Sequence, residues 1–278
     1  MRTFSHPGYK RFLLSVGCLL SIHFTALFFL TLFRLVFFFS ANYDFPDQEH
    51  VGFMSIWPAF IRGVWFDNVI ACYILLIPLV AVSISALFNY YGKILWNVTC
   101  IFFSLFYGIV LLVTAANIPY FQYFFKIINS SVFNWFGYMN TTAGMVFGET
   151  SYYPPLIGFL LTLVLFIWLM RRLIRHFQRL LNTKNPSVFW LDRIYIFLTA
   201  GICIGLCLFG IRGRTGYNPI KVSAAYYCTD PFLNQLGISP VFNLLSSTLD
   251  DSRKENRYLH LMPENEALEN TRHYLNRP

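Results

Sequence analysis

The sequence predicts an all-α integral membrane protein with five transmembrane helices, and three observations lead to this prediction. Hydrophobic residues make up 56% of the 278-residue chain and charged residues only 12%, which is too apolar for a soluble domain of this size. The apolar residues gather in five long runs, as expected for helices that cross a bilayer. A strongly basic stretch, residues 171–184, lies between the fourth and fifth runs. Short segments this rich in arginine stay in the cytoplasm and orient the rest of the chain.

The first span is predicted over residues 12–33, directly after a basic N-terminal stretch. At ~1.5 Å per residue it is about 33 Å long, which is enough to cross the hydrocarbon layer and too long for a signal peptide. His23 lies in the middle of this span. We expect a neutral histidine bonded to a neighbouring helix, with a functional role as the alternative. Arg34 follows the span and is expected to snorkel to the outer interface.

The segment that follows, residues 41–66, is acidic first and then aromatic. We expect it to lie on the outer surface as an interfacial piece. The second span is predicted over residues 69–88 and contains Pro78 near its centre, where a kink is expected. After a tight inner turn, the third span returns outward over residues 94–116.

Residues 117–155 form an outer connection that is too aromatic for a free linker, so short helices in the headgroup zone are expected there. The fourth span, residues 156–170, is only about 22 Å long as a helix and depends on interfacial tyrosines and arginines at its ends. The fifth span, residues 190–211, carries Gly201 and Gly205 four residues apart. This small-residue face lets another helix approach closely, either within the chain or, as the alternative, in a dimer.

Residues 1–211 are therefore predicted to form a five-span transmembrane domain, and residues 212–278 an extracytoplasmic segment. With the basic stretch inside, an odd number of crossings places the N-terminus inside and the C-terminus outside. The exported segment begins with a loop rich in glycine. Two short amphipathic helices are expected after it, at residues 222–227 and 240–249. Residues 250–278 contain too little apolar material to fold alone and are predicted to be a polar connector.

The composition excludes several classes of function. The net charge of +8 comes from cations near the ends of the spans, so it indicates membrane topology and not a nucleic-acid surface. Five of the six cysteines lie in apolar runs, which excludes a disulfide framework. The sequence shows no nucleophile with its base, no phosphate-binding loop and no cluster with metal-ligand spacing. We therefore predict no catalytic residue, no metal site and no cofactor in this chain.

Five polar residues at the predicted outer face are candidates for contact with lipid headgroups: Arg62, Asp67, Glu149, Arg212 and Arg214. An arginine binds a headgroup phosphate through charge-assisted hydrogen bonds. Arg62 and Asp67 lie five residues apart at the start of the second span, where an ion pair or a favourable helix-start charge is the alternative. The predicted partners are thus membrane lipids, including anionic phospholipids.

Three segments and the order of the five spans carry a resemblance to a known family. The segments are Arg62-Gly63-Val-Trp-Phe66-Asp67, Glu149-Thr-Ser-Tyr-Tyr-Pro154 and Arg212-Gly-Arg-Thr-Gly-Tyr-Asn-Pro-Ile-Lys-Val-Ser-Ala-Ala-Tyr, the last followed by Phe232-Leu-Asn-Gln-Leu and Asn243. Together they resemble the membrane half of the lipoteichoic acid synthase family, which includes sulfatase-like proteins of Bacteroides-type bacteria and belongs to the alkaline phosphatase superfamily. Asn117 and Lys126 depart from the pattern, where an acid and an arginine are expected.

The resemblance implies the membrane anchor and lipid-facing domain of a phosphoglycerol transferase or sulfatase-like enzyme in the bacterial cytoplasmic membrane. The catalytic threonine and a manganese-like divalent metal would belong to a sulfatase-like domain after Pro278. That domain would be the chain's own partner, so we expect a truncated protein or a fragment that is inactive by itself. The alternative is a stand-alone five-span transporter or assembly subunit for lipids or polysaccharides, although the spans lack paired repeats.

Overall fold

A computed structural model of the chain describes residues 6–41, 53–138, 140, 144, 148–181, 190–253 and 262–275. These residues form helices joined by short connections and contain no strand, which confirms the predicted all-α fold. Five of the helices are long and apolar enough to cross a membrane, so the protein is a multi-pass membrane protein. They are α1 (Pro7–Ser40), α2 (Phe53–Leu87), α3 (Lys93–Phe124), α5 (Tyr153–Leu181) and α6 (Trp190–Arg212).

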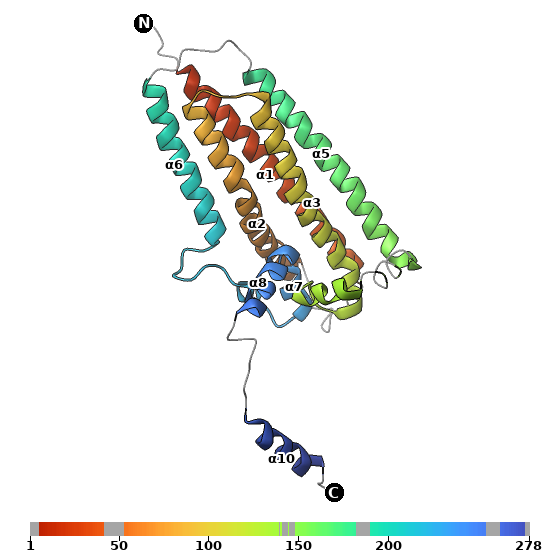
Figure 1. Ribbon diagram of the computed structural model, residues 1–278. Coiled ribbons are helices and arrows are strands. Elements are labelled where there is room, and N and C mark those ends of the chain that lie inside the picture. Colours follow the sequence, from red (N-terminus) through yellow and green to blue (C-terminus); the bar gives the residue numbers. More distant parts are fainter. Residues whose placement is uncertain are drawn as a thin grey trace.

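Helix α1 forms the centre of the bundle (Figure 1). It packs against α2, α3, α5 and α6, while α2 also packs along α6 and α3 along α5. Much of this core is aromatic. Phe166 of α5 is fully buried, and its ring lies 6.1 Å from the ring of Phe29 on α1 and 5.3 Å from that of Tyr107 on α3, edge to face in both cases. Such pairs add to the gain from burial and fix α5 against the bundle.

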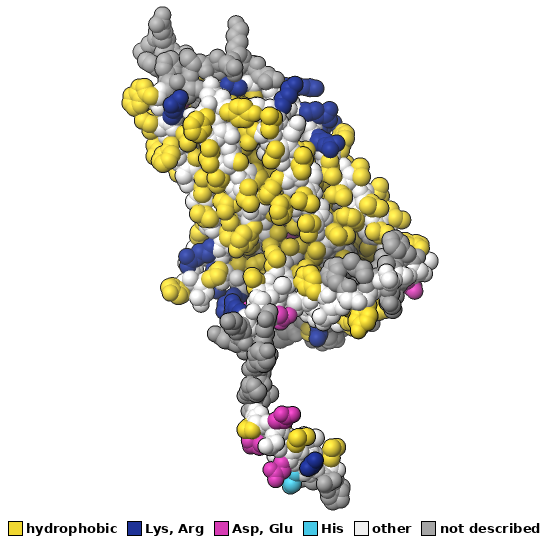
Figure 2. Space-filling view, viewed as in Figure 1, with side chains coloured by type: hydrophobic (Ala, Val, Ile, Leu, Met, Phe, Trp, Pro, Cys, Tyr) yellow, Lys and Arg dark blue, Asp and Glu magenta, His cyan; other side chains and the backbone are white. Residues whose placement is uncertain are grey.

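The outside of the bundle is apolar over most of its length, with Lys and Arg gathered towards the two ends (Figure 2). Large hydrophobic side chains remain exposed on all five spanning helices, for example Phe28, Ile77, Ile101, Leu161 and Phe197. Soluble proteins rarely expose an apolar surface of this extent. Lipid covers such a surface in a bilayer, because hydrocarbon chains solvate apolar side chains.

Helix α2 begins earlier than the second predicted span. The prediction of an interfacial segment over residues 41–66 is wrong for residues 53–66, because these residues form the first part of α2. Residues 42–52 lie outside the described part of the chain. The helix continues through both of its prolines. Phe66 is fully buried in this part of α2, and burial of this kind offsets the backbone hydrogen bond that a proline removes.

Helix α5 begins slightly before the fourth predicted span and ends well after it. It is 29 residues long, whereas the predicted span, residues 156–170, has only 15. The basic stretch of residues 171–184, predicted to connect the fourth and fifth spans, is helical as far as Leu181. Ile174 and Leu181 are buried along this extension, while Arg175 and Arg179 are exposed. The cations near the C-terminal end of α5 also interact favourably with the helix dipole. The connection to α6, residues 182–189, lies outside the described residues.

Several short helices gather at the end of the bundle opposite to the start of α1 (Figure 1). They are η1 (Ser130–Tyr138), η2 (Thr150–Tyr152), η3 (Val222–Ala225), α7 (Pro231–Leu236) and α8 (Pro240–Ser252). The predicted short helices of the aromatic connection and of the segment after α6 are thereby confirmed as helices. We call residues 222–252, with η3, α7 and α8, the end plate. Helix α10 (Glu264–Leu275) follows the end plate and has no buried residue.

Candidate functional site

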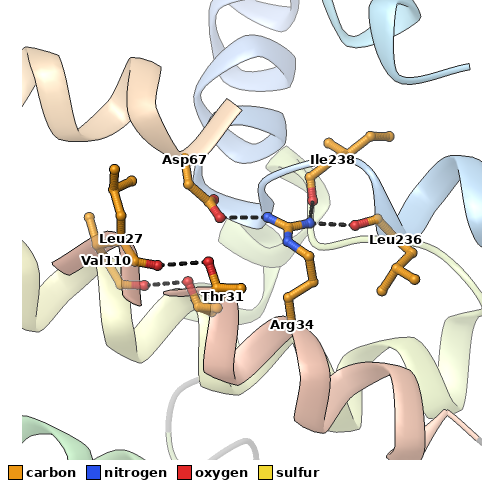
Figure 3. Close-up of polar contacts among 8 residues, drawn as sticks. Leu27, Thr31, Arg34, Asp67, Val110, Leu236 and Ile238 are labelled. Atoms are coloured by element: carbon orange, nitrogen blue, oxygen red, sulfur yellow. Dashed lines mark hydrogen bonds and ion pairs between the residues drawn. The ribbon is translucent and has the colours of Figure 1, made fainter. Parts of the chain in front are cut away.

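A buried ion pair joins the end plate to the spanning helices. The Nη2 atom of Arg34 on α1 lies 2.6 Å from the Oδ2 atom of Asp67 on α2, and the two side chains are only 5% and 2% exposed. The Nη1 atom of Arg34 donates to the carbonyl oxygens of Leu236, at the end of α7, and Ile238, the latter at 3.1 Å (Figure 3). One guanidinium group thus holds α1, α2 and the end plate together.

The prediction that Arg34 snorkels to the outer interface is wrong. Its guanidinium is enclosed because the carboxylate of Asp67 and two carbonyl groups supply the acceptors that water or lipid would otherwise supply. The same contact takes Asp67 out of the group of headgroup candidates. Asp67 is buried in this ion pair, so the alternative of an ion pair between Arg62 and Asp67 is wrong. The alternative of a helix-start charge is also wrong, because α2 begins at Phe53. Residues five apart on a helix point in different directions, and Asp67 faces α1.

Gly63 provides the space for the guanidinium group. It lies four residues before Asp67, on the same face of α2, and a Cβ atom at this position would overlap the guanidinium atoms of Arg34. This role was not predicted from the sequence, although Gly63 is part of the segment that carries the family resemblance. The useful signal was a glycine one helical turn before an acid near the end of a span.

The aromatic ring of Phe232 anchors α7 to the bundle. It is 1% exposed and lies between rings of two spanning helices, 5.7 Å from Phe37 and 6.2 Å from Phe38 on α1, and 5.6 Å from Phe121 on α3. The helix itself is started by Asp230, whose Oδ1 atom accepts from the backbone N–H of Leu233 at 2.8 Å. A short helix is thereby held in place by its neighbours, since six residues are too few to be stable alone.

Arg62 also contributes to the attachment of the end plate. Its guanidinium carbon lies 4.5 Å from the centre of the Tyr227 ring, and its Nε atom donates to the carbonyl oxygen of Ala224 at 3.3 Å. The hydroxyl of Tyr227 in turn donates to the carbonyl oxygen of Ser55 on α2. Burial raises the pKa of Tyr227 above its usual value, so the hydroxyl keeps the proton that it donates. Arg62 is therefore placed by contacts within the protein.

Further hydrogen bonds connect the end plate to the chain that follows α3. The backbone N–H of Ile127 donates to the Oε1 atom of Gln235 at 3.1 Å, and the Nδ2 atom of Asn243 donates to the carbonyl oxygen of Ile128 at 2.9 Å. The backbone N–H of Ile128 donates to the Oδ1 atom of Asn117 at 3.0 Å. Asn117, where the family pattern has an acid, is 2% exposed and positions this connection through its side-chain amide.

The remaining headgroup candidates lie in two separate places. Arg212, the last residue of α6, and Arg214, in the loop after it, are both exposed. Arg212 donates to the carbonyl oxygens of Gly216 and Tyr217. Glu149 directly precedes η2 and the start of α5. Because α5 and α6 stand on opposite sides of the bundle (Figure 1), the five candidates do not form one site.

Glu149 belongs to the wall of a large apolar cavity. The cavity has a volume of about 870 Å³ and lies between the last turns of α3, η1 and the start of α5. Its walls include Leu112, Ala116, Pro119, Tyr120, Tyr123, Trp135, Tyr152, Leu156 and Phe159. A smaller cavity of about 290 Å³ lies beside it between α1, α3 and α5, and Pro155 borders both. The volume of the larger cavity is in the range of small-ligand sites, ~300–1,000 Å³.

Gly201 and Gly205 do not pack against another helix within the described part of the chain. Both are exposed, and a Cβ atom at either position would meet nothing within 4 Å. The expected close approach within the chain is therefore wrong for these residues, and contact between two copies stays a prediction. The buried face of α6 is a different one, where Ala200 is 6% exposed and a Cβ atom at Gly210 would lie 2.6 Å from the Sγ atom of Cys72.

His23 forms the expected bond to a neighbouring helix. Its Nε2 atom lies 3.0 Å from the Oδ1 atom of Asn68 on α2, so the prediction of a bonded histidine in the span is confirmed. Among the described residues, no three His, Cys, Asp or Glu side chains come together as a group able to hold a metal ion. No family model, curated protein or solved structure matches the chain. The resemblance to the lipoteichoic acid synthase family thus stays a prediction.

Proposed function

We propose that this chain is the membrane anchor and lipid-facing domain of a phosphoglycerol-transferase-like or sulfatase-like enzyme. The observation that supports the proposal is the attachment of the end plate through Arg34. A flexible tail needs no buried ion pair, whereas a domain that carries a catalytic unit at a fixed height above the membrane does need a rigid base. The end plate is such a base, because Arg34 binds Leu236 and Ile238 while it is paired with Asp67.

The distribution of cations supports an orientation with the end plate outside. The opposite end of the bundle, where α1, α3 and α6 begin and α5 ends, carries a large group of basic residues: Arg11, Lys93, Arg171, Arg172, Arg175, Arg179 and Arg193. Basic segments next to membrane spans stay on the cytoplasmic side. The proposal therefore places the end plate and the catalytic unit at the outer leaflet of the bacterial cytoplasmic membrane.

Reporter fusions test this orientation. A phosphatase that is active only outside the cytoplasm should be active when it is fused after Pro278, and inactive when it is inserted at Lys184 in the basic stretch. A fluorescent protein that matures only in the cytoplasm should give the opposite pattern at both positions. Fluorescence behind Pro278 would contradict the orientation and the role as an outer base.

The enzymatic part of the proposal is tested by activity and by the genomic reading frame. The purified chain should hydrolyse neither phosphatidylglycerol nor a sulfate ester. The gene should continue in frame after Pro278 into a domain with a threonine nucleophile and ligands for a divalent metal, and the joined protein should gain metal-dependent activity. Turnover by this chain alone, or a stop codon followed by an intergenic region, would contradict the proposal and favour the stand-alone transporter or assembly subunit.

A further inference from the structure

The cavity between α3, η1 and α5 has walls suited to a hydrocarbon chain. Leu112, Leu156 and Phe159 line its side towards the middle of the bundle, and they belong to helices that cross the membrane. In a bilayer, this side of the cavity would therefore lie at the level of the lipid acyl chains. Burying a hydrocarbon chain against such walls is favourable in proportion to the apolar area removed from water.

The charge around the cavity selects among the lipids that bear such chains. Residues 127–170 contain a single charged side chain, Glu149, and it lines the cavity. The last turns of α3 that border the cavity carry no charge either. Lys126, two residues after the end of α3, is exposed and does not line the cavity. At the wall of the cavity an anionic headgroup would meet a carboxylate, whereas a headgroup with an ammonium group would gain a charge-assisted hydrogen bond.

Tyrosine hydroxyls supply neutral donors beside the carboxylate. Tyr120, Tyr123, Tyr138 and Tyr152 all line the cavity. The hydroxyl of Tyr120 donates to the Oδ1 atom of Asn129 at 3.4 Å, and the rings of Tyr123 and Tyr152 are stacked with centroids 6.1 Å apart. Burial raises the pKa of Tyr152, so its hydroxyl is protonated at neutral pH. Such hydroxyls can bind the phosphate of a zwitterionic headgroup without adding positive charge.

We propose that this cavity binds one acyl chain of a phospholipid with a primary-amine headgroup, whose ammonium group pairs with Glu149 while tyrosine hydroxyls contact its phosphate. The inference rests on the proposed lipid-facing role, and it concerns a lipid bound by the spanning helices, not the substrate of the catalytic unit. It also differs from the prediction of anionic phospholipids among the partners, which would require the exposed Arg212 and Arg214 at the end of α6.

Lipid binding to the full-length chain tests the proposal. The delipidated protein is mixed with equal amounts of phosphatidylethanolamine, phosphatidylglycerol and diacylglycerol of the same chain length, and the retained lipid is quantified by native mass spectrometry. The amine lipid should be retained about tenfold more than each of the others, because only its headgroup gains the charge-assisted hydrogen bond to Glu149. Equal retention of the three lipids, or preference for phosphatidylglycerol, would overturn the proposal.

Variants separate the two parts of the site. Glu149→Gln should abolish the preference for the amine lipid, and Glu149→Lys should reverse it towards phosphatidylglycerol. Leu112→Trp should reduce the retention of all three lipids about tenfold by filling the cavity. Leu105→Trp is the matched control, because Leu105 lies two turns earlier on the same helix and is similarly exposed, 59% against 47% for Leu112, but does not line the cavity.

The control should keep wild-type retention, and both tryptophan variants should keep the wild-type melting temperature, since both positions are on the surface. Equal effects of the two tryptophan variants, or an unchanged preference in Glu149→Gln, would place the lipid elsewhere and overturn the proposal. Either failure leaves the reporter and activity tests of the anchor role unaffected, so the two proposals can fail independently.

Discussion

Arg34 and Asp67 form an ion pair of 2.6 Å at the point where α1, α2 and the end plate meet. Each side chain is almost fully buried, so neither charge is compensated by water. The desolvation cost of such a pair is offset only as far as further hydrogen bonds satisfy its remaining polar atoms, and the Nε atom of Arg34 is buried without a hydrogen-bond partner among the described residues. The carbonyl oxygens of Leu236 and Ile238 accept hydrogen bonds from Arg34. The stability of the ion pair between α1 and α2 therefore depends on the end plate being bound to the bundle.

Replacing Asp67 with Asn should destabilise the protein and loosen the end plate. The substitution leaves the Arg34 charge buried without a counter-ion, at an expected cost of about 3–5 kcal/mol. Cys228 of the end plate, half-buried beside Asn234, should then react faster with a membrane-impermeant maleimide. The double variant Arg34→Met with Asp67→Leu should lose less stability than Asp67→Asn. A wild-type labelling rate in Asp67→Asn would show that the ion pair does not hold the end plate.

Replacing Gly63 with Ala should destabilise the protein by about 1–3 kcal/mol, because the added methyl group overlaps the Arg34 guanidinium and overpacking costs this much. Gly201→Ala is the matched control in a spanning helix, since its methyl group meets no atom within 4 Å. The control should be neutral or up to ~1 kcal/mol more stable, as alanine favours helix. Thermal unfolding in detergent measures both variants, and equal melting temperatures would contradict the role of Gly63.

Replacing Phe232 with Ala should cost about 3–5 kcal/mol, because it leaves a cavity between α1, α3 and α7. Limited proteolysis should then cut the chain at Lys221, directly before the end plate, sooner than in the wild type. Phe39→Ala is the control, since Phe39 is 72% exposed and should change stability by less than ~0.5 kcal/mol. Similar cleavage rates in the two variants would argue against Phe232 as an anchor of α7.

Alkaline pH should weaken the wild type more than a Tyr227→Phe variant. Burial raises the pKa of Tyr227 in the folded protein above the value of ~10 for an unperturbed tyrosine. The folded state then binds the proton more tightly, so this contribution to stability is complete below pH ~10 and is lost as the pH rises further.

The variant lacks the proton and the hydrogen bond to Ser55, so at neutral pH it should be about 1 kcal/mol less stable. The difference between the two proteins should shrink between pH 9 and pH 11 when unfolding is followed by tryptophan fluorescence. A difference that stays constant or grows over this range would contradict the buried, protonated state of Tyr227.

The amino-acid sequence alone was enough to predict the five spans and two of the short helices after α6, η3 and α8, whereas α7 (Pro231–Leu236) was not predicted. A spanning helix is recognised locally, because lipid solvates its side chains and its backbone bonds within itself. The ends of these helices were less predictable: α2 begins at Phe53 and α5 continues to Leu181, since buried side chains such as Phe66 and Ile174 extend both beyond their purely apolar parts.

The candidate site was predictable only in part. Glu149 was singled out as the sole acid of its connection, and it lines the main cavity, but nothing in the sequence places α3 and α5 around it. Arg62 and Asp67 were grouped because they are close in the chain. The structure separates them, and it joins Asp67 to a residue 33 positions earlier.

What the sequence determines by itself is the class of the protein, because hydropathy and the placement of arginines act over one span or one connection. Tertiary structure decides the role of Arg34, whose acceptors include carbonyl groups 202 and 204 residues away in the chain. A buried charge is stable only where several distant groups converge on it. Whether distant groups converge in this way depends on how the helices pack, so it cannot be predicted from a local pattern of residues.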